Sequence, residues 1–92
     1  MEEKIVTRHP KGKKGVNINK AKYETMKKAI ISVLNKEPLT HHELTHATER
    51  QLRGKFEGSI PWYMEATKLD LEARGILERV PGEKGEVYRV KR

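Results

Sequence analysis

The chain has 92 residues and a net charge of +7, with 20 Lys and Arg residues against 13 Asp and Glu residues. This length fits one small domain, and a hydrophobic content of 35% leaves no room for a deep catalytic cleft. The absence of cysteine excludes disulfides, thiolate nucleophiles and cysteine-ligated metal sites. Because no apolar run reaches the roughly 18 residues of a membrane span and the first residues lack the pattern of a signal peptide, we expect a cytoplasmic protein without membrane contact.

The positive charge is concentrated at the two ends of the chain. Residues 1–28 hold nine Lys and Arg residues against three Glu residues, for a net charge of +6. Residues 29–78 hold six against eight acidic residues, for −2, and residues 79–92 hold five against two, for +3. Any polyanion is therefore expected to meet the ends of the chain.

Two helices are predicted in the first half of the chain. The first runs from about residue 19 to residue 36, with Asn19 as its N-cap. The second begins at a capping box, in which the Thr40 hydroxyl and the Glu43 carboxylate each accept a hydrogen bond from a free backbone N–H group. Gly54 is a suitable residue for ending this second helix.

A third helix is predicted from Ser59 to Gly75, and its apolar residues lie on two nearly opposite faces. One face packs on the other helices. The second face needs a cover of its own, either the N-terminal segment or another copy of the protein, and stacking of its tryptophan on a nucleic-acid base is a further alternative. The second face consists of Trp62, Ala66, Leu69 and Ala73.

Short strands are predicted at both ends of the chain. After the third helix the apolar residues alternate with period two, which predicts a hairpin of strands 76–80 and 86–90 around the turn 81–85. In the N-terminal segment, residues 5–6 and 16–18 are candidate strand fragments on either side of a flexible basic loop.

The order of three helices and a two-stranded hairpin resembles a winged helix-turn-helix domain. The most specific part of the resemblance runs from Leu71 to Arg79 and reads L-E-x-x-G-φ-φ-x-R, where φ is apolar. Many winged-helix regulators carry a similar run where the recognition helix ends and the wing begins. The resemblance covers residues 19–92 and implies an α+β, mostly helical fold, with residues 1–18 as a basic N-terminal arm or extension.

The chain is also similar to a family of small bacterial proteins without an established function. The similarity lies in residues 58–63 and 68–75 and in the basic lead-in at residues 9–12. It again implies a winged-helix fold and brings no activity with it.

The run His42-Glu43-Leu44-Thr45-His46 spells H-E-x-x-H, in which two histidines bind zinc and the glutamate activates a metal-bound water. Glu43 is already used by the capping box, however, and the two histidines lie roughly opposite Leu44, toward solvent. A domain of this size also offers no evident third ligand or substrate groove. We therefore predict no metal site, no cofactor, no small-molecule substrate and no catalytic residue, with weak binding of nickel or zinc as the alternative.

The basic ends make nucleic acid, DNA in the first instance, the expected partner. A flexible basic arm and a wing tip can contact phosphates without a helix that reads bases. The third helix is poorly suited to reading bases, because residues 59–74 hold three acidic residues against two basic ones. The residues predicted to contact nucleic acid are Lys11, Lys13, Lys14 and Lys20 near the N-terminus, Ser59, Tyr63 and Lys68 on the third helix, and Lys84 and Arg89 on the wing.

Two alternatives to nucleic-acid binding remain open. The same lysines also suit a solvated surface that only keeps the protein soluble. A protein-interaction module that does not bind DNA and dimerises through Trp62, Ala66 and Leu69 explains the second apolar face. The charge of the third helix favours the interaction module, whereas the charge of the ends favours DNA.

Overall fold

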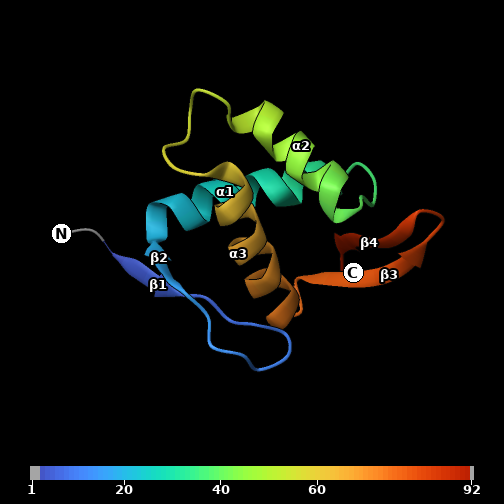
Figure 1. Ribbon diagram of the computed structural model, residues 1–92, viewed down its shortest axis with the longest axis horizontal. Helices are drawn as coiled ribbons and strands as arrows, with labels where there is room; N and C mark the ends of the chain where they lie inside the picture. The colour runs from blue at the N-terminus through green and yellow to red at the C-terminus, as the bar shows by residue number, and fades with distance from the viewer. Residues whose placement is uncertain (1–2, 92) are drawn as a thin grey trace.

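The computed structural model describes residues 3–91, which form three helices and two antiparallel hairpins (Figure 1). The helices pack on one another, and one hairpin lies at each end of the chain. The fold is therefore α+β and mostly helical, as predicted. The helices are α1 (Lys20–Leu34), α2 (His41–Leu52) and α3 (Ile60–Ala73). The strands of the N-terminal hairpin are β1 (Lys4–Val6) and β2 (Asn17–Asn19), and those of the C-terminal hairpin are β3 (Leu77–Gly82) and β4 (Gly85–Val90).

Local hydrogen bonds fix the start of each helix. The Asn19 side chain accepts a hydrogen bond from a backbone N–H group in the first turn of α1. Before α2, the Thr40 hydroxyl accepts from the Glu43 N–H at 3.1 Å, and the Glu43 carboxylate accepts from the Thr40 N–H at 3.0 Å. Ser59 caps α3 by accepting from the N–H of Trp62. The predicted N-cap Asn19 and the predicted capping box of Thr40 and Glu43 are confirmed, and the third helix starts at Ser59 as predicted.

Two of the helices end at glycines with positive φ. Gly54 (φ +78°) follows the C-cap of α2, and Gly75 (φ +79°) follows the C-cap of α3. Glycine adopts this left-handed conformation at no steric cost, which is why the predicted ends of both helices hold. α1 is slightly shorter than the predicted range 19–36 and ends at Leu34.

The C-terminal hairpin is longer, and its turn tighter, than predicted. The strands pair as far as Gly82 and Gly85, so the turn consists of residues 83–84 and not of residues 81–85. Glycines on both sides of the turn let the backbone close over two residues. The hairpin is also held against the helices, because Leu39, between α1 and α2, exchanges two backbone hydrogen bonds with Tyr88 of β4 (3.2 and 2.8 Å).

The core lies between the three helices and the base of the C-terminal hairpin. The first apolar face of α3 points into it as predicted, and Thr67 on that face has no exposed surface. The largest fully buried apolar side chains are Met26, Ile30, Leu44, Met64, Leu71 and Leu77.

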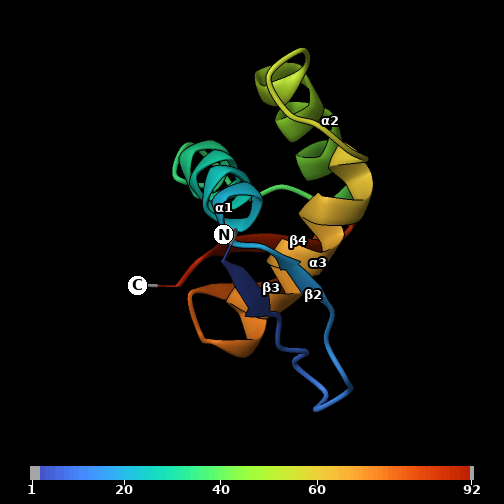
Figure 2. The same ribbon diagram turned by 90° about the vertical axis from the view of Figure 1, so that its left-hand side faces the viewer.

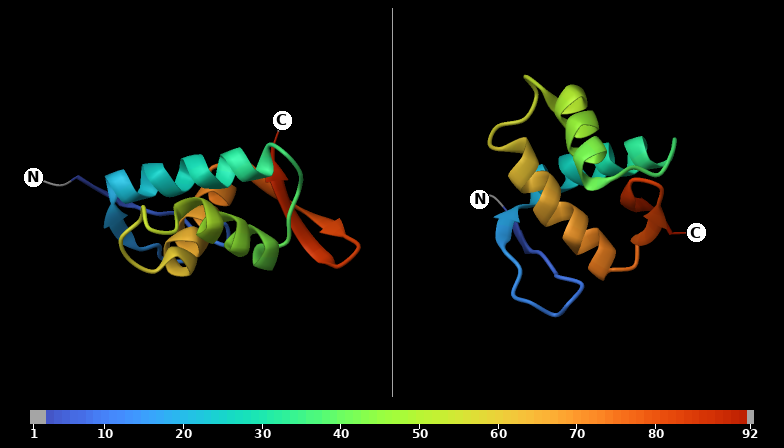
Figure 3. Two further views of the ribbon diagram at one scale, coloured as in Figure 1. Left: turned by 90° about the horizontal axis from the view of Figure 1, so that it is seen from above. Right: turned by 45° about the vertical axis from the view of Figure 1, so that its right-hand side comes forward.

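The N-terminal hairpin lies beside α3 and the start of α1, with its loop projecting away from the helices (Figures 2 and 3). Its two strands contain the fragments predicted at residues 5–6 and 16–18, except that Val16 precedes β2. Within residues 3–91, no helix has both the length and the apolar character that crossing a membrane requires.

Candidate functional site

The N-terminal loop is anchored to the helices through one buried carboxylate. Asp70 of α3 has no exposed surface, and its Oδ1 accepts a hydrogen bond from the backbone N–H of Arg8 at 2.8 Å. Its Oδ2 accepts from the Tyr23 hydroxyl of α1 and from Nε of Arg74 at 2.8 Å. Burial and the hydrogen bond to Asp70 raise the pKa of Tyr23, and the hydrogen bond to Asp70 raises the pKa of Arg74. The entry of the loop is therefore tied to both α1 and α3.

The two ends of the loop are closed on each other. The backbone N–H of Thr7 donates to the Val16 carbonyl at 2.8 Å, and the Thr7 hydroxyl accepts from the Val16 N–H at 2.9 Å. Gly15 lies so close to this crossing that a Cβ on it would stand 1.7 Å from the Thr7 carbonyl oxygen. Only glycine permits this approach, so the closed base of the loop requires a glycine at position 15.

Four of the predicted nucleic-acid contacts are exposed lysines that form no ion pair with any residue in the range 3–91. Three of them share the N-terminal loop, and the fourth stands in the turn of the C-terminal hairpin. They are Lys11, Lys13, Lys14 and Lys84.

Two other predicted contacts are already engaged in surface ion pairs. Nζ of Lys20 lies 3.2 Å from a carboxylate oxygen of Glu3, and Nε of Arg89 lies 2.6 Å from one of Glu78. Both basic side chains remain about half exposed. Their charge is partly offset where they stand, so they are weaker candidates than the four free lysines.

The prediction that Lys68 contacts nucleic acid is wrong, because this side chain is buried. Its residue is only 4% exposed, with Nζ 2.9 Å from Nδ1 of His41 and 4.1 Å from the ring centre of Tyr88. Burial, reinforced by the neighbouring Arg79, lowers the pKa of Lys68 to about 8. Burial and the Lys68 charge likewise lower the pKa of His41. The ammonium group is enclosed between α2 and the C-terminal hairpin and is not presented to a nucleic acid.

The other predicted contacts on α3 have structural partners. The Ser59 hydroxyl is occupied as the N-cap. Tyr63 is half-buried, with its ring edge-to-face against Phe56 and Trp62 at centre distances of 5.1 and 4.9 Å. Nζ of Lys22 lies 5.2 Å from the centre of the Tyr63 ring. Tyr63 is therefore poorly placed for reading base edges, whereas Ser59 is exposed at the start of α3.

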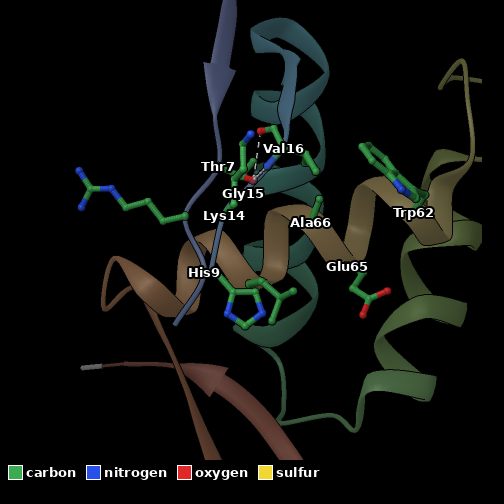
Figure 4. A pocket seen from close by; sticks show the side chains of 10 residues that line it. Thr7, His9, Lys14, Gly15, Val16, Trp62, Glu65 and Ala66 are labelled. Atoms are coloured by element: carbon green, nitrogen blue, oxygen red, sulfur yellow. Dashed lines mark hydrogen bonds between the residues drawn. The ribbon is translucent and has the colours of Figure 1, made fainter. Parts of the chain in front are cut away.

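The second apolar face of α3 is only partly covered. Trp62 is 48% exposed, and together with Ala66 and Leu69 it lines a cavity of about 170 Å³ whose other wall is the N-terminal loop (Figure 4). Val16 lies in that wall and is 37% exposed. The N-terminal segment thus packs near this face, as one of the predicted covers, and leaves about half of the tryptophan surface accessible.

The two histidines of the H-E-x-x-H run face each other on the surface of α2. Their Nε2 atoms are 3.1 Å apart and both side chains are exposed. Glu43 is held in the capping box, and the backbone hydrogen bond from Thr40 lowers the pKa of Glu43. Within residues 3–91, no three His, Cys, Asp or Glu side chains gather where they would hold a metal ion. The pair His42 and His46 therefore lacks a third ligand in the described part of the chain.

The role of Asp70 as the anchor of the loop was not predicted from the sequence. In the sequence, Asp70 counts only as a negative charge on the third helix, and its direct neighbours Leu69 and Leu71 do not indicate that it is buried. No local pattern indicates that its partner is Arg8 at the other end of the chain.

A family model matches residues 4–88, from the first strand into the last. The chain belongs to DUF6958, a family of unknown function. No curated protein and no solved structure gives a match. The DUF6958 match includes the N-terminal hairpin and its basic loop as well as the three helices, so the loop lies inside the region that the family model matches.

Proposed function

We propose that this protein binds nucleic acid, DNA in the first instance, through phosphate contacts made by the N-terminal loop and the tip of the C-terminal hairpin. The observation that carries the proposal is the set of three exposed lysines, Lys11, Lys13 and Lys14, on one loop whose base is anchored to Asp70. Cations held close together release counterions from the phosphate backbone on binding, which supplies affinity without any reading of sequence.

The order of the helices and the C-terminal hairpin along the chain supports this proposal. Three helices followed by a hairpin is the order of a winged helix-turn-helix domain, with α3 in the recognition position and β3–β4 as the wing. The two backbone hydrogen bonds between Leu39 and Tyr88 hold the wing against the helices. Lys84 in the turn is therefore carried at a defined position and not on a free appendage.

The charges on α3 favour modest sequence specificity. Lys68 is buried, and the Arg74 guanidinium that follows the helix is bound to Asp70. Glu65 remains exposed and repels phosphates. A helix with these features offers few donors to base edges in the major groove, so the loop and the wing, and not α3, are expected to carry the binding.

A second candidate function rests on the apolar face of α3. Trp62 and Val16 are large hydrophobic side chains with considerable exposure (48% and 37%), and tryptophan is enriched in interface hot spots. An interaction module that dimerises through this face predicts that Trp62→Ala converts a dimer into a monomer in sedimentation, with no binding to DNA.

The decisive experiment measures binding to a labelled random duplex at low salt by fluorescence anisotropy. Replacing Lys11, Lys13 and Lys14 by Glu should weaken binding at least about tenfold. Three phosphate contacts are lost, and the glutamates that take their place repel the phosphates. The matched control replaces Lys28, Lys36 and Lys55 by Glu, which changes the net charge equally at exposed lysines outside the loop. Equal losses in both variants would contradict a role for the loop, and no binding by the wild type would favour the interaction module.

A further inference from the structure

The strongest unexplained feature is the cavity beside Trp62. Its volume of about 170 Å³ corresponds to the liquid volume of about six water molecules, which is below the roughly 300–1,000 Å³ of typical small-molecule sites. A space of this size suits one flat ring system. The Trp62 side chain stands at one end of the cavity, with the N-terminal loop opposite (Figure 4).

The cavity is held open by fixed contacts. The hydrogen bonds between Thr7 and Val16 close the base of the loop, and the Arg8 N–H binds Asp70 at 2.8 Å. Gly15 also packs closely against the Thr7 carbonyl, where the two ends of the loop meet. A ligand therefore meets a preformed wall, which reduces the entropy that binding costs.

The lining of the cavity combines an apolar surface with one basic and one acidic side chain. Trp62, Ala66 and Leu69 give α3 an apolar surface at the cavity. Lys14 lines the loop side and belongs to the group of exposed lysines, whereas Glu65 lines the side of α3. An anionic backbone is attracted to the loop and repelled from Glu65, so an uncharged ring attached to that backbone is directed toward the tryptophan.

We propose that this cavity takes one unpaired base of a single-stranded nucleic acid, stacked on Trp62, while the neighbouring phosphates lie on Lys14 and the rest of the loop. The inference rests on the proposed function and deepens it, because it names the form of nucleic acid that the loop holds. Every base has a π-face, so stacking on an aromatic side chain is tolerant of sequence. This fits a protein whose α3 has few groups for reading base edges.

An unpaired base fits these observations better than a duplex or a second copy. Both faces of a base inside a duplex are already stacked, so it reaches a tryptophan only after it is extruded from the helix. A second copy would bring an equally basic loop toward the same surface, where the exposed Lys11, Lys13 and Lys14 repel their counterparts. Charge complementarity therefore favours a polyanion with an exposed ring.

The test compares oligothymidylate with a phosphodiester oligomer of equal length that lacks bases, and with a duplex. Binding is followed by anisotropy of an end label and by the fluorescence of Trp62, the only tryptophan in the chain. Oligothymidylate should quench Trp62 and bind about tenfold more tightly than the abasic oligomer, the order expected for one base stack. Trp62→Ala should reduce oligothymidylate binding to the abasic level and leave abasic binding unchanged, with Trp62→Phe in between. Val6→Ala, at a residue that is 65% exposed and outside the cavity lining, is the matched control and should change neither.

The outcomes separate this inference from the proposed function. The base site is overturned if oligothymidylate and the abasic oligomer bind equally well and Trp62 is not quenched. Nucleic-acid binding still stands in that case if replacing Lys11, Lys13 and Lys14 by Glu weakens duplex binding. No binding of any of the three oligomers overturns both. A Trp62 emission that shifts with protein concentration alone overturns the base site in favour of a second copy on this face.

Discussion

The backbone N–H of Arg8 donates a hydrogen bond to Oδ1 of Asp70 at 2.8 Å, across 62 positions of the chain. Because Asp70 also accepts from Tyr23 and Arg74, one carboxylate joins the N-terminal loop, α1 and the end of α3. The loop that carries the basic residues is therefore coupled to the core at a buried charge, where the loss of a partner is costly.

Asp70→Ala should lower the free energy of unfolding by about 3 kcal/mol, since it leaves the groups around the buried carboxylate without their acceptor. Urea denaturation followed by circular dichroism gives the value. The control is Glu78→Ala, which removes an acid from an exposed pair with Arg89 and should cost less than about 1 kcal/mol. Equal losses from the two substitutions would show that Asp70 is not an anchor.

Duplex binding should weaken with salt according to the number of phosphates contacted. Each contact adds about −0.9 to the log–log slope on B-DNA, so four to six contacts from the loop and the C-terminal hairpin predict a slope of roughly −4 to −5. Replacing Lys11, Lys13 and Lys14 by Glu should flatten the slope by about 3. Tyr63→Ala should have a smaller effect, with little change in sequence preference. Loss of binding in the Tyr63 variant together with silent lysine changes would place the interface on α3.

Lys68 should make stability depend on pH in the alkaline range. Its pKa is about 8 in the folded protein, whereas a lysine in an unfolded chain has a pKa of about 10.4. Between these values the unfolded chain binds more protons, so the free energy of unfolding should rise as the pH is raised from about 8 toward about 10. Above about pH 10 the raised pKa of Tyr23 opposes this rise, because the unfolded tyrosine then loses its proton first.

The measurement is the urea midpoint of the wild type and of Lys68→Met at several pH values in that window. The methionine variant keeps most of the packing volume and lacks the titrating group, so its midpoint should not show the rise. An identical pH dependence of the two proteins would mean that Lys68 keeps an ordinary pKa in the folded state.

Zinc should bind the pair His42 and His46 no more tightly than tens of micromolar, an order-of-magnitude limit for two imidazoles without a third protein ligand. Isothermal titration calorimetry gives the affinity, and the double alanine variant should lose the binding and keep its melting temperature, because both side chains are exposed. A one-to-one site of nanomolar affinity would contradict this limit. Peptidase activity that is lost in Glu43→Gln would contradict the prediction that the chain has no catalytic residue. Glutamine preserves the capping box and removes only the carboxylate, so such a loss would not come from unfolding of the helix start.

Features that depend only on residues close together in the chain could be predicted from the sequence. The predicted N-caps at Asn19 and Thr40 and the predicted helix start at Ser59 are confirmed, because each of these side chains accepts a hydrogen bond from a backbone N–H group three residues further along the chain. The helix ends at Gly54 and Gly75 follow from the backbone freedom of glycine at those positions. The period-two alternation near the C-terminus indicated the hairpin, although its tighter turn required the pairing of the whole strands.

Tertiary structure alone decided which charged and aromatic side chains remain accessible. Lys68 and Asp70 stand two residues apart on α3, yet one is buried against His41 and Tyr88 and the other under the N-terminal loop. Charge counts along the chain treat such residues as surface charges, because burial depends on elements that are distant in sequence. The half-exposed Trp62 has the same origin, since only the folded loop sets how much of the second apolar face of α3 stays open.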